Sequence, residues 1–362
     1  MESRESLNLY GFIRRNEGLA YVLSIGKKNQ FLPVIGKVKS NCLIPDGYDL
    51  SGTFKDGEIV FHYRENDQWL KAEKDIVDLS DSFKRTPFPQ HLMEVLKRSL
   101  VVLFGLGSVG SRIALGLARS GIMNFRLIDP DVFAIENASR HECDLLDLGR
   151  FKVEAIKERI LRVNPLAKVE VFPFDILEKR ETVRKKTFIN AHLVIATTDR
   201  KAVQLRVNYE CYKRNLPALF AGCYDEARAG EILYVIPGET VICYECLRGG
   251  TKQQEKPREY DYSRARDSQD YEGEPGLNGA INLVSDVAEQ YAIAMLLRKE
   301  DCEMAKLIDP KRNLLFIGGA LGKGFCYLKD TYCFKKPFEF VFPVIKEPWK
   351  ECGTCQITRK GS

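Results

Sequence analysis

The sequence is poor in histidine, has no long apolar run and shows little imbalance of charge. No metal-ligand spacing is present among its four histidines, which argues against a histidine-bound metalloprotease. No run approaches the roughly 20 apolar residues that span a bilayer, and the first residues lack the apolar core of a secretory signal. The 55 basic and 50 acidic residues are mixed along the chain, giving a net charge of +5. We therefore expect a cytoplasmic protein that binds neither nucleic acid nor membrane.

The remaining composition is that of an ordinary globular protein. Hydrophobic residues make up 44% and charged residues 29% of the 362 positions, which excludes collagen, coiled coil and wholesale disorder. This length predicts roughly two domains at about 150 residues each. The 11 cysteines are an odd number. In the absence of a secretory signal they indicate thiols or a metal site rather than a disulfide framework.

Residues 1–80 are predicted to form a small β-rich module. Strand patterns occupy 21–25 and 58–64, and a Lys-Asp-Gly turn precedes the second strand. Residues 81–99 contain two prolines followed by an apolar pattern, which indicates a linker and a short helix. We assign the third segment, 100–362, to one larger domain.

From residue 100 onward, short apolar runs alternate with helical patterns. Strands are predicted at 101–104, 125–129, 169–172 and 193–196, with helices at 112–119 and 151–163 between them. This alternation predicts an α/β fold with a doubly wound, mainly parallel, Rossmann-like sheet. The polar stretch 249–275 is predicted to be a crossover loop, followed by a helix near 281–297 and antiparallel strands within 325–344.

A glycine-rich turn lies between the first of these strands and its helix. Gly105, Gly107 and Gly110 fit G-x-G-x-x-G in the strand–turn–helix context that the motif requires. Such a turn brings phosphates close to backbone N–H groups at a helix N-terminus. Asp129 ends the next strand, where an acidic residue can accept hydrogen bonds from ribose hydroxyls. The alternative is a purely structural turn.

A polar cluster follows Asp129, and a nicotinamide dehydrogenase has no need of it there. The cluster includes Asp131, Asn137, Arg140 and Lys152. Arg and Lys side chains neutralise the charge of β- and γ-phosphates, and Asn can anchor an oxygen, so the cluster favours a triphosphate. Taken singly, each residue has a structural alternative, such as a helix cap or a solvated surface charge.

Two C-x-x-C pairs predict a structural metal site. Cys243 and Cys246 form the first knuckle, and Cys352 and Cys355 form the second. Four thiolates complete a tetrahedral Zn²⁺ site and leave no open position for water, so the ion would be structural.

The stretch 101–165 resembles the adenylation domain of the ubiquitin-activating-enzyme superfamily, of the ThiF/MoeB type. It contains the glycine-rich turn, D-x-D, N-x-x-R-[QH], G-x-x-K and N-P in that order. The form with His141 resembles bacterial members, and a weaker likeness extends to about residue 297. Many members carry paired zinc knuckles, usually closer in sequence than here.

The resemblance assigns roles to individual residues. It implies that Asp129 holds the ribose, that Asn137, Arg140 and Lys152 hold the triphosphate, and that Asp199 binds Mg²⁺. Asp199 lies at the end of a predicted strand, where Mg²⁺ sites form, although it would equally serve as an N-cap.

A catalytic cysteine and a partner-supplied arginine are the two family features without a firm match. Many members transfer the acyl group to a cysteine in the crossover loop, but residues 249–275 contain none. Cys223 is a weaker candidate, and a buried structural cysteine is the alternative. Members also donate an arginine across a homodimer interface, for which Arg85 is a loose positional match.

Together these observations predict an ATP·Mg²⁺-dependent enzyme that adenylates the C-terminal carboxylate of a ubiquitin-like protein for conjugation or sulfur transfer. We also expect a homodimer and a possible conjugating enzyme as partner. Three alternatives stay open: a synthetase that modifies a small peptide, an NAD-dependent oxidoreductase, and a non-enzymatic scaffold.

Overall fold

The chain divides into two compact units, Met1–Thr86 and Pro87–Ser362. The computed structural model describes residues 82–356 except 180, 250–274, 328–331 and 346, together with residues 8–14, 19–27, 30–37, 49–55, 58–65, 67–71 and 73–76. The predicted crossover loop, 249–275, lies outside the described residues except at its two ends.

The first unit is built from two small sheets, which confirms the expected β-rich module. A four-stranded sheet has the order β3-β2-β1-β7, and a three-stranded sheet has the order β4-β5-β6. All neighbouring strands pair antiparallel except β1 and β7, which are parallel. The strands are β1 Asn8–Arg14, β2 Leu19–Lys27, β3 Gln30–Lys37, β4 Asp49–Lys55, β5 Glu58–Glu65, β6 Gln68–Lys71 and β7 Glu73–Ile76.

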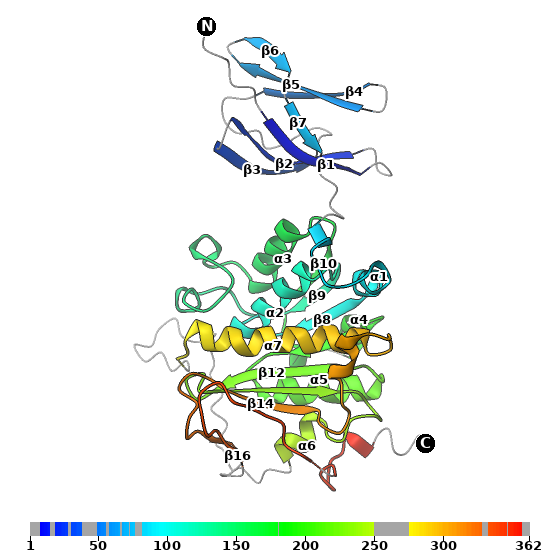
Figure 1. Cartoon of the computed structure of the whole chain (residues 1–362), viewed down its shortest axis with the longest axis vertical. Helices are drawn as coiled ribbons and strands as arrows, with labels where there is room; N and C mark the ends of the chain where they lie inside the picture. The colour runs from blue at the N-terminus through cyan, green and yellow to red at the C-terminus, as the bar shows by residue number, and fades with distance from the viewer. Residues whose placement is uncertain are drawn as a thin grey trace. The chain divides into compact units, whose positions relative to one another are not determined.

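The second unit contains an eight-stranded sheet with the order β10-β9-β8-β11-β12-β13-β14-β17 (Figure 1). Strands β10, β9, β8, β11 and β12 are mutually parallel, and β13, β14 and β17 continue the sheet antiparallel. The strands are β8 Leu100–Phe104, β9 Asn124–Ile128, β10 Lys168–Phe172, β11 Leu193–Ala196, β12 Ala218–Tyr224, β13 Ala229–Val235, β14 Leu314–Gly318 and β17 Phe340–Val341. The mainly parallel α/β prediction is confirmed.

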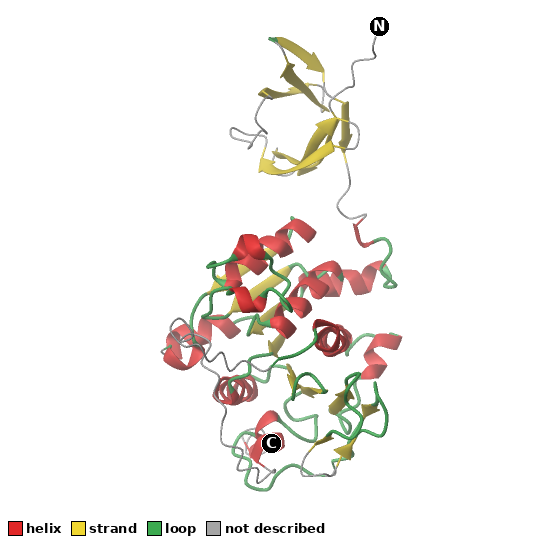
Figure 2. Cartoon of the chain, turned by 90° about the vertical axis from the view of Figure 1, so that its left-hand side faces the viewer, coloured by secondary structure: helices red, strands yellow, loops and turns green. Residues whose placement is uncertain are grey.

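Helices cover both faces of this sheet (Figure 2). Helix α7 packs against α2, β12 and β13, and α5 and α6 pack on the opposite face over a buried core that includes Phe104, Phe220 and Phe316. The helices are α1 Gln90–Arg98, α2 Ser108–Arg119, α3 Lys152–Val163, α4 Glu181–Phe188, α5 Lys201–Lys213, α6 Tyr244–Gly249 and α7 Asn278–Leu297. Short 3₁₀ turns occur at η3 Ile135–Asn137, η4 Leu145–Asp147, η5 Ile176–Glu178 and η6 Glu303–Leu307.

Helix α7 corrects one expectation. Its 20 residues are long and apolar enough to cross a membrane by length and composition, whereas no such run was expected. The helix lies across the sheet in Figure 1, and most of it is buried within the protein. A core helix that is apolar on most sides explains the composition without a bilayer.

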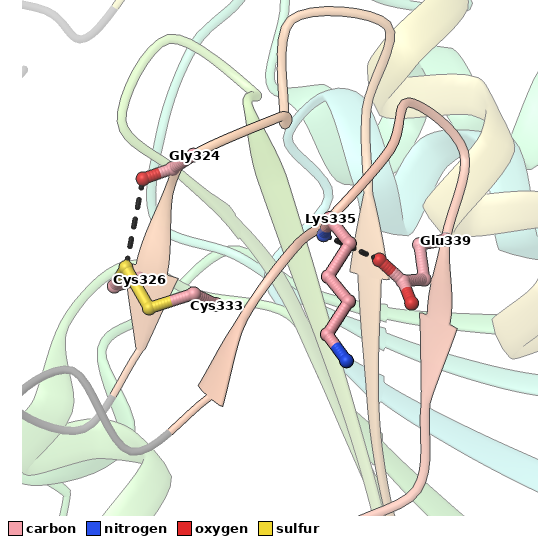
Figure 3. The surroundings of a disulfide bond; sticks show 5 residues. All are labelled: Gly324, Cys326, Cys333, Lys335 and Glu339. Atoms are coloured by element: carbon pink, nitrogen blue, oxygen red, sulfur yellow. Dashed lines mark hydrogen bonds between the residues drawn. A yellow bond between two sulfur atoms is a disulfide. The ribbon is translucent and has the colours of Figure 1, made fainter.

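A hairpin with a disulfide bond lies between β14 and β17 (Figure 3). Strands β15 Cys326–Tyr327 and β16 Tyr332–Cys333 pair antiparallel, and Cys326 is bonded to Cys333. The expectation of free thiols is therefore wrong for this pair, because the hairpin register places the two side chains opposite each other. Beyond it, the Glu339 carboxylate accepts a hydrogen bond from the Lys335 backbone N–H at 2.6 Å.

Candidate active site

The glycine-rich turn connects β8 to α2 at the carboxyl edge of the parallel strands. Gly105 has φ +86°, and a Cβ there would lie 2.8 Å from the Thr198 backbone nitrogen. A Cβ on Gly110 would lie 2.0 Å from the Gly105 carbonyl oxygen. A Cβ on Gly107 would meet nothing within 4 Å. Gly105 and Gly110 are thus required for packing, whereas Gly107 faces open space where a phosphate can approach the backbone.

Both backbone polar groups of Leu106, in this turn, form hydrogen bonds with side chains. Its N–H donates to the Asp129 carboxylate at 2.6 Å, and its carbonyl lies 2.6 Å from His141 Nε2. His141 Nδ1 accepts from the Cys143 N–H at 3.0 Å, so Nε2 must carry the proton and donate. Burial lowers the pKa of His141 to about 4, and the ring is therefore neutral at pH 7.

Lys152 forms the centre of an acidic cluster beside the turn. It begins α3 and is buried, and its Nζ lies 2.9 Å from the Asp131 carboxylate. Burial opposes its charge, but the carboxylates of Asp129, Asp131 and Asp199 outweigh that effect and raise the pKa of Lys152. Burial likewise raises the pKa of Asp129, an effect that Lys152 opposes. The fold therefore brings the charges of Lys152 and Asp199 to the Asp129–Asp131 segment, although the three segments are separate in the sequence.

Asn137 and Arg140 belong to the loop that leads from β9 to α3. The Asn137 side-chain oxygen accepts a hydrogen bond from the Ala134 N–H at 3.1 Å, and both side chains are half-buried. Asn137 therefore shapes its own loop, consistent with the capping alternative, and its amide nitrogen keeps its donor capacity.

Asp199 lies at the carboxyl end of β11 and is exposed. The N-cap position of α5 belongs to Arg200, whose N–H is bound by the Thr198 hydroxyl oxygen at 3.0 Å. Asp199 therefore lies one residue before the N-cap position of α5. An exposed carboxylate at this edge is a suitable Mg²⁺ ligand.

The candidates for a partner-supplied arginine and for a catalytic cysteine lie in different units of the chain. Arg85 is exposed near the end of the first unit. Cys223 is half-buried near the end of β12, at the same sheet edge as the glycine-rich turn. Among the other described cysteines outside the knuckles, burial raises the pKa of Cys143 to about 12 and also raises that of Cys211. Neither of these two is a poised nucleophile.

The sequence did not predict two residues that support the site, Thr197 and Arg159. The Thr197 hydroxyl donates to the Gly105 carbonyl at 2.8 Å and so fixes the turn against the end of β11. Arg159 on α3 binds Asp144 and Asp147 at 2.7 and 2.6 Å, which holds the loop before Lys152. The position of Thr197 directly after an apolar strand could have indicated its role from the sequence. The contacts of Arg159 could not be predicted, because they depend on how the loop folds back onto α3.

The four knuckle cysteines converge in the second unit. All four are buried, and their sulfur atoms lie within 4.8 Å of one another. Cys243 Sγ is 3.8 Å from Cys246 Sγ and 3.5 Å from Cys352 Sγ, and Cys246 Sγ is 3.5 Å from Cys355 Sγ. Ligands about 2.3 Å from a tetrahedral Zn²⁺ are roughly 3.8 Å apart, so this cluster fits a metal ion.

A protein-family model described as the ThiF family matches residues 80–316. The ubiquitin-like modifier-activating enzyme 5 of Caenorhabditis elegans is 30% identical over 198 residues, which cover 51% of this chain and 46% of the relative. The molybdopterin-synthase adenylyltransferase of Escherichia coli is 28% identical over 156 residues, covering 42% and 60%. The chain thus spans about half the length of the curated relatives it matches.

Among solved structures, Escherichia coli MccB in complex with AMPCPP and MccA superposes with a TM-score of 0.53. The match is 21% identical and covers 73% of this chain and 68% of the other. At this identity the likeness shows a common fold.

Proposed function

Because this chain belongs to the ThiF family, we propose that it is an ATP- and Mg²⁺-dependent adenylyltransferase acting on the C-terminal carboxylate of a ubiquitin-like protein. A carboxylate oxygen attacks the α-phosphorus, the bond to the bridging oxygen breaks, and pyrophosphate leaves. The product is an acyl-adenylate, activated for conjugation or sulfur transfer. The protein contributes positioning and charge neutralisation.

The observation that carries this proposal is the buried Lys152 among three carboxylates beside an open glycine-rich turn. A dehydrogenase has no use for a buried cation at that point, whereas an adenylating enzyme must neutralise triphosphate charge. Rotation of Lys152 from Asp131 toward a phosphate exchanges one charge-assisted hydrogen bond for another. Arg140, on the neighbouring loop, supplies a second cation.

The remaining residues fit ATP and Mg²⁺ by their chemistry. The open space over Gly107 admits a phosphate, and Asp129 keeps lone pairs for a ribose hydroxyl after accepting two backbone N–H bonds. Asp199 offers an exposed carboxylate to Mg²⁺. The metal, when bound, withdraws charge from the phosphate oxygens, and Asp199 orients it.

We assign the four-cysteine cluster to a structural Zn²⁺. With four protein ligands the ion has no open position, so its role is to join the two knuckles. The first knuckle lies at α6 beside α5, and the second lies 109 residues later. Zinc therefore fixes the region after β17 to the sheet domain.

The choice of a ubiquitin-like acceptor is supported by the name of the Caenorhabditis elegans relative, a ubiquitin-like modifier-activating enzyme. A short peptide is the alternative acceptor. Pyrophosphate release should be measured with a Gly-terminated ubiquitin-like protein and with its isolated C-terminal peptide. Release with the folded protein alone supports the proposal, and equal release with the peptide supports a peptide-modifying enzyme.

We also propose that the active form is a homodimer. The segment that carries Asn137 and Arg140 exposes several large apolar side chains, which in a monomer would face water. These are Val132, Ile135, Leu145, Leu146, Leu148 and Phe151. A second copy would cover them. The family resemblance implies that a partner-supplied arginine serves the γ-phosphate, and Arg85 is the positional candidate for it; in that case Arg85→Ala lowers turnover and leaves the oligomeric state unchanged.

The central experiment is isothermal titration of Mg·ATP and of NADH against the wild-type chain and Asp199→Ala. We expect Mg·ATP to bind, and its Mg²⁺-dependent affinity to fall in the variant. Binding of NADH without Mg·ATP would overturn the proposed function in favour of an oxidoreductase. Binding of neither nucleotide, also in the presence of an acceptor, would favour a scaffold.

A further inference from the structure

The Glu245 carboxylate connects the two cysteine knuckles, whose four sulfur atoms also lie close together. Glu245 lies between Cys243 and Cys246 in the first knuckle and is half-buried. Its side chain reaches across to the second knuckle, 108 to 109 residues away in the chain. This contact is separate from the four sulfur positions and has no counterpart in the C-x-x-C pattern.

Three donors of the second knuckle bind this carboxylate. The Gly353 N–H donates to Glu245 Oε1 at 3.3 Å, and the Thr354 N–H donates to Oε2 at 2.9 Å. The Thr354 hydroxyl also donates to Oε2. Gly353 and Thr354 are the two residues between Cys352 and Cys355, so the carboxylate binds the turn that presents both sulfurs.

The hydrogen bonds of Thr354 to Glu245 matter for stability because Thr354 is shielded from water. Thr354 is only 4% exposed, and Cys352 and Cys355 are also buried. Without Glu245, the N–H and the hydroxyl of the buried Thr354 would lose their acceptor, which is costly away from water, whereas the exposed Gly353 N–H could bond to solvent. The turn would then rearrange to find other partners, and the two sulfurs would move with it.

We propose that Glu245 is a positioning residue for the metal, holding the second knuckle in the conformation that binds Zn²⁺. The inference rests on the proposed zinc site. Holding the two knuckles together has an entropic cost, and the hydrogen bonds of Glu245 to the second knuckle offset part of it. Outer-shell partners of this kind typically change metal affinity by about 10- to 100-fold when removed.

Two residues of α5 also contact the knuckles. The Tyr212 hydroxyl lies 3.6 Å from Cys355 Sγ, and Asn208 Oδ1 accepts from the Tyr244 N–H at 3.2 Å. These residues orient the first knuckle and one sulfur of the second. Glu245 differs from them in that it binds the backbone of the 352–355 turn directly from the first knuckle.

The test is the Zn²⁺ dissociation constant of the full chain, measured by competition with a chromogenic chelator. We expect Glu245→Ala to weaken binding about 10- to 100-fold and Glu245→Gln, which keeps one acceptor oxygen, to weaken it less. Glu351→Gln is the matched control, because Glu351 is exposed, adjacent to Cys352 and carries the same charge. Its affinity should stay within about threefold of the wild type.

Thermal unfolding separates metal positioning from general stability. The rise in Tm between excess chelator and saturating Zn²⁺ should be smaller for Glu245→Ala than for the wild type. If Glu245→Ala does not fold, Thr354→Val removes one donor, and Thr354→Ser restores it. Equal Zn²⁺ affinity in the wild type and in Glu245→Ala, or in Thr354→Val, overturns the proposal. A wild-type chain that takes up no Zn²⁺ instead refutes the zinc site.

Discussion

At the scale of single residues, the site depends on charges that have been removed from water. Lys152 is buried beside Asp131, and the charges of Asp129 and Asp199 also favour its cationic form. A buried ion pair contributes little net stability, but removal of one partner leaves the other uncompensated. Function and stability are therefore coupled at this lysine, and a useful variant must separate them.

We expect Lys152→Met to abolish ATP binding and to lower the free energy of unfolding by about 3 kcal/mol, because the buried Asp129 and the partly buried Asp131 lose their neighbouring cation. The double variant Lys152→Met/Asp131→Asn should regain part of the stability without regaining ATP binding. Urea unfolding and titration calorimetry measure the two effects, and Lys157→Met on the same helix is the control. Retention of ATP affinity in Lys152→Met would contradict the assigned role.

His141 predicts a loss of stability in acid. Its pKa is lowered from 6.5 to about 4 in the folded state, so the unfolded chain binds a proton that the folded chain does not. This contribution to stability is complete above pH 6.5 and is lost as the pH falls toward 4, by about 3 kcal/mol in total.

The variant His141→Gln tests this, because an amide can also donate to the Leu106 carbonyl and accept from the Cys143 N–H. Urea unfolding at pH 7 and pH 5 should show a smaller loss of stability in the variant than in the wild type. An identical pH dependence in the two proteins would mean that another group is responsible.

At the scale of elements, the β8–turn–α2 segment offers a matched pair of glycine substitutions. We expect Gly110→Ala to lower the free energy of unfolding by at least about 3 kcal/mol, because its Cβ would collide with the Gly105 carbonyl. Gly107 has φ −71°, which alanine adopts freely, and its Cβ would meet no protein atom.

Gly107→Ala should therefore leave stability within about 0.5 kcal/mol of the wild type. Its affinity for Mg·ATP should nevertheless fall at least about tenfold, since the methyl group occupies the space above the turn. Unchanged affinity in this variant would show that the phosphates do not pass over Gly107.

The elements that the sequence predicted are those whose signals are local. The apolar run of β8, the glycine turn and the Asp129 strand end lie within 30 residues of one another, and motif spacing places them. The antiparallel strands β13 and β14 had no comparable signal, since their order in the sheet follows from long-range pairing. The bond between Cys326 and Cys333 was missed for a related reason, because a C-x₆-C spacing does not reveal a hairpin register.

The residues of the candidate site were likewise predicted only in part. Its motif residues were predicted from their spacing and from the family resemblance, but the contacts that hold them were not. The bond from His141 to Leu106 joins residues 35 apart, and that from Thr197 to Gly105 joins residues 92 apart. Such partners become visible only when the strand order is known.

At the scale of the whole molecule, the exposed apolar segment at 132–151 predicts a self-associating protein. We expect the wild-type chain to be a dimer by size-exclusion chromatography with light scattering, and Leu146→Asp, at a side chain 90% exposed, to be a monomer. Leu307→Asp introduces the same charge at an exposed leucine on η6 and should leave the dimer intact. A monomeric wild type would refute the dimer.

The separation of the knuckles also sets an order of events during synthesis. Cys243 is made 109 residues before Cys352, and chains grow at about 5 to 20 residues per second. For about 5 to 20 seconds, each nascent chain therefore carries two buried-site cysteines whose partners have not yet been translated. If the cluster binds Zn²⁺ as proposed, Cys243 and Cys246 are until then half a ligand set, open to oxidation or to another metal, and correct loading requires that this pair be protected during translation.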